Sequence, residues 1–305
     1  MMSNSNEHFQ FTDERFADLQ MLRYRLNGFE DLTLSQQIYI YCLAKATLMG
    51  RDITFDQQGK YNLRIRKTLE AIYKHYDGDR TSDDFKALEV YLKRVWFSSG
   101  IYHHYGCEKF KPGFSEHFFY EAVSMMPETE LPLKRGETKE DLLDELVPVI
   151  FDEEVLPKRV NQTDGVDLVA TSACNFYEDV TQDEVERFYA RLKDGEDLTP
   201  PSYGLNSKLM KRNGEIVEKT WKEEGMYGTA IKEITSWLLK AQKYTENEQQ
   251  AHVIDLLIKY YRTGDLSDFD RYSIAWVKQQ EGMVDFINGF IEVYGDPLGL
   301  KGTWE

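Results

Sequence analysis

The chain has 305 residues, of which 41% are apolar, enough to bury a substantial hydrophobic core. Acidic residues outnumber basic ones 53 to 37, giving a formal charge of −16. This balance argues against a nucleic-acid partner, because a phosphate backbone is bound by clustered Lys and Arg, and it favours cationic or neutral substrates. No apolar run reaches about eighteen residues, and the first ten residues lack a secretory-signal pattern, so no membrane segment is expected.

The first third of the chain has the pattern of helices. Thr33 or Ser35 can cap a helix that ends at Gly50, since hydroxyl side chains favour helix starts and glycine favours helix ends. Two more helices are predicted near residues 63–76 and 84–95.

The middle of the chain contains two predicted surface connections. Residues 127–140 and 194–202 concentrate Pro, Gly and charged residues, and they are possible internal boundaries of a unit that spans residues 1–305. Between them, residues 165–178 are rich in Val, Ala and Thr and predict a strand. Thr181 and Glu184 form a capping-box pattern that predicts a helix directly after it.

The clearest β signal lies at residues 203–221. Asn213-Gly214 favours a tight turn with positive φ, so the flanking residues should form an antiparallel hairpin. Two long helices are predicted to follow, at about 227–244 and 246–261. The predicted fold class is therefore α+β, predominantly helical with a small antiparallel β portion.

Several common sites are not expected. The histidines include no pair spaced for a zinc-binding helix, and no other metal motif is recognisable, so no metal ligands are predicted in this chain. Nucleotide-binding glycine loops and the serine-hydrolase elbow are missing too. The acidic run Asp152–Glu154 is interpreted as a solvated loop. The histidines are His8, His75, His103, His104, His117 and His252.

The three cysteines are Cys42, Cys107 and Cys174, which stand far apart with no C-x-x-C pair. This spacing predicts unpaired thiols in a reducing compartment. A cytoplasmic location is therefore expected, with a periplasmic one after signal removal as the alternative.

Glu292 breaks the local pattern near the end of the chain. The apolar residues of 283–294 surround all sides of a helix, which predicts a buried helix that ends near Tyr294 because Asp296 precedes Pro297. In its last turn, Glu292 would face the negative end of the helix dipole and lose solvation. Either Glu292 belongs to a functional site, or a Lys or Arg from elsewhere pairs with it.

Two stretches carry a family resemblance. "GFIEVYGDPLGLKGTWE" (residues 289–305), preceded by "IAWVKQQEGMVDFIN", and "SSGIYHHYGCEKFKP" (residues 98–112) resemble segments of the dipeptidyl peptidase III family of zinc exopeptidases. The "YGLNSK" stretch and the helices after "EGMYG" are similar as well. The family's His-Glu-x-x-x-His zinc motif and its further Glu ligand are missing from this sequence, so we expect the chain to be an N-terminal portion of a longer enzyme.

The resemblance implies a two-lobed peptidase that removes dipeptides from the free N-terminus of short peptides. This chain would be the substrate-binding lobe, and its partner would be a C-terminal lobe of the same polypeptide that holds the zinc. Alone, it should bind no zinc and should not be catalytic. The alternative is a non-catalytic peptide-binding or protein-interaction module.

The resemblance also implies roles for four residues. Glu292 matches the carboxylate that binds the substrate ammonium, and Glu305 matches a second acidic residue of the cleft. Tyr294 matches a catalytic tyrosine whose hydroxyl group hydrogen-bonds near the scissile carbonyl. Tyr105 matches an aromatic residue that lines the cleft.

Overall fold

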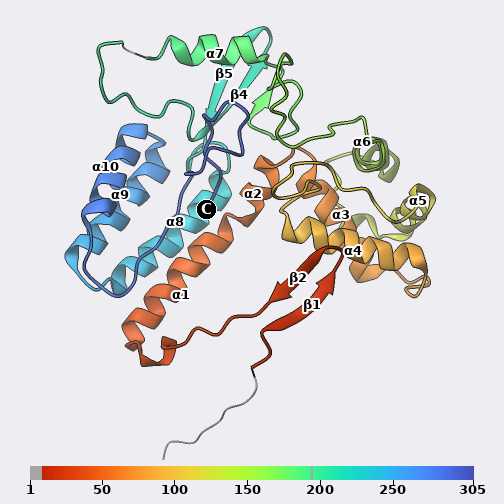
Figure 1. Cartoon of the computed structure of the whole chain (residues 1–305), viewed down its shortest axis with the longest axis horizontal. Coiled ribbons are helices and arrows are strands. Elements are labelled where there is room, and N and C mark those ends of the chain that lie inside the picture. The colour runs from red at the N-terminus through yellow and green to blue at the C-terminus, as the bar shows by residue number, and fades with distance from the viewer. Residues whose placement is uncertain (1–8, 194) are drawn as a thin grey trace, which may run out of the picture.

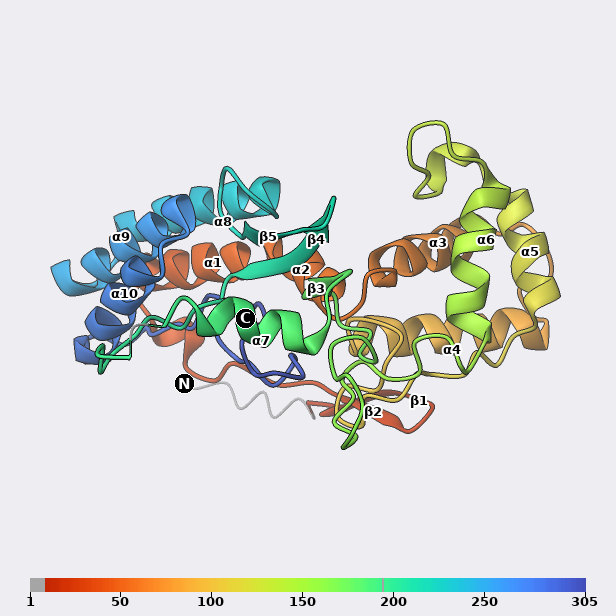
Figure 2. The same cartoon turned by 90° about the horizontal axis from the view of Figure 1, so that it is seen from above.

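The computed structural model describes residues 9–193 and 195–305, so His8 and Asp194 lie outside it. Two groups of helices stand apart, α3 to α6 on one side and α1 with α8 to α10 on the other (Figures 1 and 2). A small sheet and α7 lie between the two groups, and the chain ends in the middle of the molecule. The predicted class, mostly helical with a small β portion, is confirmed.

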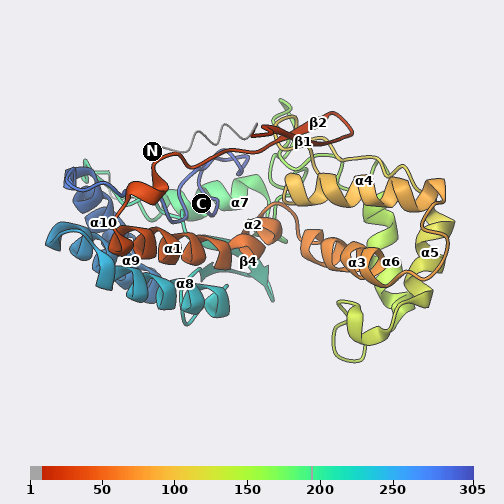
Figure 3. The same ribbon diagram turned by 90° about the horizontal axis from the view of Figure 1, so that it is seen from below.

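The first half of the chain forms a hairpin and the first helices. Strands β1 and β2 pair antiparallel and lie beside α4, where Lys93 binds Glu14 at 2.5 Å and Arg94 binds Asp18 at 3.3 Å (Figure 3). The elements are β1 (Thr12–Phe16), β2 (Leu19–Leu22), α1 (Leu34–Met49), α2 (Arg51–Gln57), α3 (Asn62–His75), α4 (Asp83–Phe97), α5 (Glu116–Met125) and α6 (Lys139–Phe151), with short 3-10 turns at Phe29–Asp31 and Glu128–Glu130.

The predicted helices of this half are confirmed. The side chain of Thr33 accepts the N–H of Gln36 and the Gln36 side chain accepts that of Thr33, so the capping box forms at Thr33 rather than Ser35. Helices α3 and α4 lie where the apolar pattern places them. With α5 and α6, which were not predicted, they bury a core of aliphatic and aromatic side chains around Leu69, Leu88 and Phe119.

The second half contains the three-stranded sheet, in the order β3-β4-β5. Strand β3 runs parallel to β4, and β4 pairs antiparallel with β5 across the turn at Asn213 and Gly214, whose φ angles are 51° and 83°. The hairpin prediction is therefore confirmed. The elements are β3 (Tyr177–Glu178), α7 (Gln182–Ala190), β4 (Ser207–Arg212), β5 (Glu215–Thr220), α8 (Gly228–Ala241), α9 (Glu248–Thr263) and α10 (Leu266–Lys278), with a 3-10 turn at Gln242–Tyr244.

Two predictions of secondary structure are wrong. Of residues 165–178, only Tyr177 and Glu178 form a strand, and the rest are turns, a bend and irregular backbone. Residues 283–294 form no helix but an irregular segment with one β-bridge, Phe290 to Trp304. Val284 and Phe290 of this segment are buried by residues distant in sequence, whereas Met283, Ile287 and Tyr294 are exposed, so the burial here does not require helical geometry.

The C-terminal segment is part of the second core. The Phe290 ring lies 4.7 Å from that of Trp221 and 5.4 Å from that of Trp304, measured between centroids. The Trp304 ring covers Gly50, where a Cβ atom would come within 2.0 Å of it. This contact joins the end of the chain to the junction of α1 and α2.

Glu246 holds the start of this segment against the helices. Its carboxylate accepts the backbone N–H groups of Met283 at 2.9 Å and Val284 at 3.0 Å, and side-chain N–H groups of Gln36 and Gln250. Partial burial alone would raise the pKa of Glu246, but these hydrogen bonds outweigh it and lower the pKa below its ordinary value.

Glu246→Gln is expected to lower the free energy of unfolding by about 1–2 kcal/mol at pH 7, because a neutral amide accepts these bonds less well than a carboxylate. The folded-state pKa is lowered, so the stabilisation is complete above the unfolded-state pKa and is lost as the pH falls through the folded-state pKa. Urea unfolding of both proteins between pH 7 and pH 3 measures the difference, with exposed Glu248→Gln as control. A difference in the free energy of unfolding between variant and parent that does not decrease towards pH 3 would contradict this prediction.

Candidate functional site

The predicted acidic residues lie on two paired stretches of backbone, 289–292 and 303–305. Gly289 and Glu305 exchange both backbone hydrogen bonds, at 3.0 and 2.9 Å. Next to this pair, the N–H of Ile291 donates to Thr303 at 3.0 Å, whereas the N–H of Thr303 donates to Glu292 at 2.8 Å. Two residues therefore oppose one, which is a β-bulge, and bulges change the direction of nearby side chains.

Gln57, at the end of α2, holds the second stretch in place. Its side-chain Nε2 donates to the Gly302 carbonyl at 3.0 Å, and its Oε1 accepts the N–H of Trp304 at 2.9 Å. Gln57 is fully buried. Because both arms of one amide bind the same stretch, Gln57 determines where Trp304 and Glu305 lie. Nothing in the sequence pattern identified this role.

Glu292 and Glu305 are brought together and are both half-buried. Burial, and then the negative charge of Glu292, raise the pKa of the Glu305 carboxyl group. Within residues 9–193 and 195–305, no Lys or Arg side chain forms an ion pair or hydrogen bond with Glu292. The alternative of a Lys or Arg that pairs with Glu292 therefore finds no such residue within the described residues. Two neighbouring carboxylates without an internal cation form a site that a cationic ligand can complete.

Tyr294 and Tyr105 are strongly exposed, at 75% and 84%. The loop that carries Tyr105 is shaped by His103, whose Nδ1 accepts the N–H groups of Tyr105 and Gly106 at 3.2 and 2.9 Å. Residues of segments 106–107, 158–163 and 294–299 line a hollow of about 700 Å³, which we call the Tyr294 pocket. The structure thus brings the segments of Tyr105 and Tyr294 to one pocket.

Asp296 and Lys301 order the turn after Tyr294. The buried Asp296 carboxylate accepts the N–H groups of Leu300 and Lys301 at 2.8 and 3.0 Å and the Tyr177 hydroxyl group at 2.8 Å. The Lys301 ammonium, also buried, donates to Tyr189, and burial lowers its pKa to about 8. Both charges sit in an apolar stretch of sequence, and this was the signal that could have identified them as buried.

No metal centre is formed by the part of the chain that the structure describes. No three His, Cys, Asp or Glu side chains in it converge as a metal ion would require. His103 and His104 stack on each other, with ring centroids 4.5 Å apart. Asp152, Glu153 and Glu154 are exposed, as predicted for a solvated loop. These residues do not fit zinc, so no chemical step of this chain is derived through a metal.

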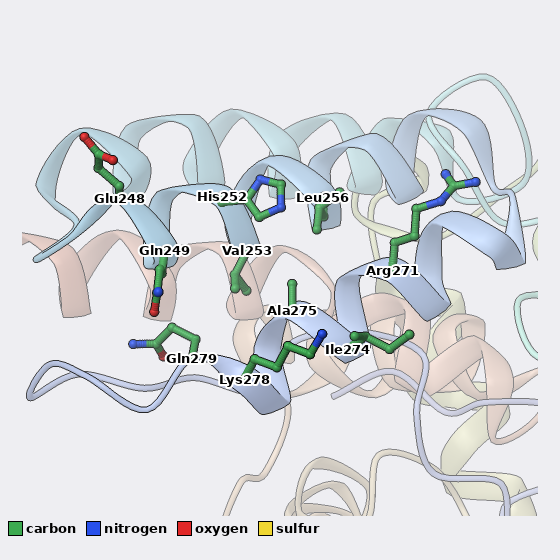
Figure 4. A pocket seen from close by; sticks show the side chains of 10 residues that line it. All are labelled: Glu248, Gln249, His252, Val253, Leu256, Arg271, Ile274, Ala275, Lys278 and Gln279. Carbon is green, nitrogen blue, oxygen red and sulfur yellow. The ribbon is translucent and has the colours of Figure 1, made fainter.

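A second groove lies between α9 and α10 and contains none of the predicted residues. Its volume is about 660 Å³, and side chains such as His252 and Leu256 from α9 face Ile274 and Lys278 from α10 (Figure 4). Arg271 in this groove is already paired with Asp268. The groove shares no residue with the paired stretches or with the Tyr294 pocket, so it has no part in the candidate site.

Comparisons with known proteins find one family. Residues 203–305, which contain both paired stretches, match the model of Peptidase family M49. Dipeptidyl peptidase 3 of Mus musculus is 23% identical over 91% of this chain, and that of Homo sapiens is 22% identical over 91%. Each match covers 42% of the relative, so the chain spans about two fifths of the length of these proteins.

Solved structures show the same fold. Dipeptidyl peptidase III from Caldithrix abyssi matches with a TM-score of 0.58 and 18% identity, over 92% of this chain and 40% of the other. The enzyme from Corallococcus sp. strain EGB matches with a TM-score of 0.56 and 14% identity, over 92% and 39%. The chain is therefore similar to the dipeptidyl peptidase III family in sequence and in fold. The resemblance seen in the sequence is confirmed.

Proposed function

We propose that this chain is the substrate-binding lobe of a zinc-dependent dipeptidyl peptidase that acts on short peptides with a free N-terminus. The observation that carries the proposal is the pair of half-buried carboxylates, Glu292 and Glu305, with no cation of the described chain beside them. A peptide ammonium group supplies the missing charge. An exopeptidase needs such a fixed anchor, because the bond that it cleaves lies at a set distance from the end of the peptide.

In this proposal Tyr294 is the catalytic residue of the chain, with its hydroxyl group donating a hydrogen bond near the scissile carbonyl. Its high exposure supports this role, since the hydroxyl group is free to meet a ligand. Tyr105 offers a ring to the bound peptide from the neighbouring loop. Both tyrosines flank the Tyr294 pocket through their segments.

The zinc ion, which would activate the attacking water, has to be held by residues outside this chain, in a C-terminal lobe of the same polypeptide. The chain alone would then be inactive and would bind peptides weakly, because one wall of a cleft buries only part of a ligand.

In the described residues, none of the helices is sufficiently long and apolar to cross a bilayer. We propose a cytoplasmic location, in keeping with three cysteines that form no disulfide.

Titration of the isotope-labelled chain by NMR tests this function. The amide of Ala-Gln-Ala with a free N-terminus should bind about ten-fold more tightly than the same peptide with an acetylated N-terminus, since acetylation removes the charge that the two carboxylates receive. Shifts should concentrate at residues 289–294 and 303–305. Equal affinities would contradict the anchor and favour a module that binds peptides or proteins without recognising their N-terminus.

A further inference from the structure

The Tyr294 pocket has a charge that the proposed function does not use. Two charged side chains line it, Lys158 and Asp296. The Asp296 carboxylate is buried and bound by backbone N–H groups and by Tyr177, so its charge is compensated inside the protein. Lys158 is exposed, and its ammonium group has no hydrogen bond or ion pair within the described residues, not even with Glu108, its neighbour across an isolated β-bridge. The ammonium group of Lys158 is therefore free to pair with a ligand.

A second cationic side chain, that of Arg159, follows Lys158 in the same segment. Arg159 donates from Nη2 to the His104 carbonyl at 3.1 Å and to the Cys107 sulfur at 3.4 Å, and its buried Nε has no partner among the described residues. No acidic side chain neutralises it there. Lys158 and Arg159 thus place two cationic side chains next to each other in a chain whose overall charge is −16, with Glu108 as the acidic neighbour of Lys158 across the β-bridge.

The pocket is formed in advance, because its three segments are bonded to one another. The N–H of Arg159 donates to the Cys107 carbonyl at 2.8 Å, and Gln162 Nε2 donates to the Pro297 carbonyl at 3.0 Å. Cys107 has a left-handed φ of 63°, which is costly for a residue with a side chain and persists only where the surroundings hold it. Such preformed pockets with a few polar groups are typical of ligand sites.

We infer that the Tyr294 pocket binds a carboxylate of the peptide, with Lys158 as its ion-pair partner. The carboxylate comes from an Asp or Glu side chain or from the C-terminus of a short peptide. This inference rests on the proposed function, because it places the anion of the peptide beside Tyr294 while the ammonium group lies at Glu292 and Glu305. The lobe would then bind both the ammonium group and a carboxylate of the same peptide.

NMR titration of the 305-residue chain with three peptides, all with free N-termini, tests the inference. The probes are the amides of Ala-Glu-Ala and Ala-Gln-Ala and the free acid of Ala-Gln-Ala. At least one carboxylate-bearing probe should bind about 3- to 10-fold more tightly than the neutral amide, the range for an ion pair that is partly shielded from water. A gain for the Glu peptide assigns the carboxylate to a side chain, and a gain for the free acid assigns it to the C-terminus.

Variants connect this gain to Lys158. Lys158→Gln should abolish it and Lys158→Arg should retain it, while Lys219→Gln, which removes an exposed and equally unpaired lysine on β5, should leave it unchanged. Equal binding of all three probes, or a gain that survives Lys158→Gln, would overturn the inference.

The acetylated forms of the same probes separate this inference from the proposed function. If acetylation weakens binding while the carboxylate has no effect, the ammonium anchor stands and the carboxylate site fails. If the carboxylate gain depends on Lys158 while acetylation has no effect, the carboxylate site stands and the anchor fails. No binding of any probe overturns both.

Discussion

If the proposed function holds, Glu292→Gln should lower kcat/KM for dipeptide release on the order of tens to thousands of times in an enzyme that joins this chain to the proposed zinc-binding lobe. Removing one partner of a desolvated charge pair costs roughly 2–5 kcal/mol. The amide keeps the shape of the side chain but leaves the arriving ammonium group poorly compensated. The effect should be seen in kcat/KM for peptides or dipeptidyl naphthylamides with a free N-terminus.

The same variant should fold as well as the parent, or slightly better. No basic side chain of the described residues depends on Glu292, and the substitution removes repulsion between Glu292 and Glu305. Urea unfolding measures this, and exposed Glu215→Gln in β5 is the matched control, which should change neither quantity. A well-folded Glu292→Gln enzyme with unchanged kcat/KM would falsify the anchor role. A large loss of stability would instead indicate a structural role.

Gln57→Leu should lower the free energy of unfolding by about 2–6 kcal/mol. Leucine has a similar volume but leaves the Gly302 carbonyl and the Trp304 N–H without partners, and each buried unsatisfied polar group costs about 1–3 kcal/mol. In the fraction that still folds, Trp304 and Glu305 lose their support. The chain should therefore also lose part of its higher affinity for peptides with a free N-terminus over peptides with an acetylated one.

Gln58→Leu is the control for this experiment, because it makes the same substitution one residue further on, where the side chain is partly exposed. It should change the unfolding free energy by less than about 0.5 kcal/mol. Urea unfolding followed by tryptophan fluorescence compares the two variants. Similar stabilities for Gln57→Leu and Gln58→Leu would show that the two buried hydrogen bonds do not hold the C-terminal stretch.

Elements governed by short-range chemistry were predictable. The helix cap at Thr33, the capping box at Thr181 and the turn at Asn213-Gly214 depend on residues at most three positions apart, and all three form. Helices α1, α3, α4, α8 and α9 follow from their apolar patterns and end within a few residues of their predicted bounds. The four candidate site residues came from the family resemblance, which was carried by short motifs.

The conformation of the residues around the site depends on contacts with residues far away in the sequence. Gly50 was interpreted as a helix stop, yet its φ of −86° suits any residue, and α2 begins directly after it. Glycine is needed there because the Trp304 ring leaves no room for a Cβ atom. Likewise, the run 283–294 reads as a helix because its apolar side chains are frequent, but Phe290 packs against Trp221 and Trp304 instead.

The composition of the chain favours cationic or neutral ligands throughout, and the paired carboxylates agree with that expectation. The unpaired Lys158 in the Tyr294 pocket does not follow from net charge, because it depends on a fold that places Lys158 near an Asp296 whose charge is compensated by backbone N–H groups. The placement of Glu305 likewise depends on hydrogen bonds between Gln57 and residues about 245 positions away. Local propensities specify the helices and turns, whereas the site requires partners that only the folded chain brings within reach of one another.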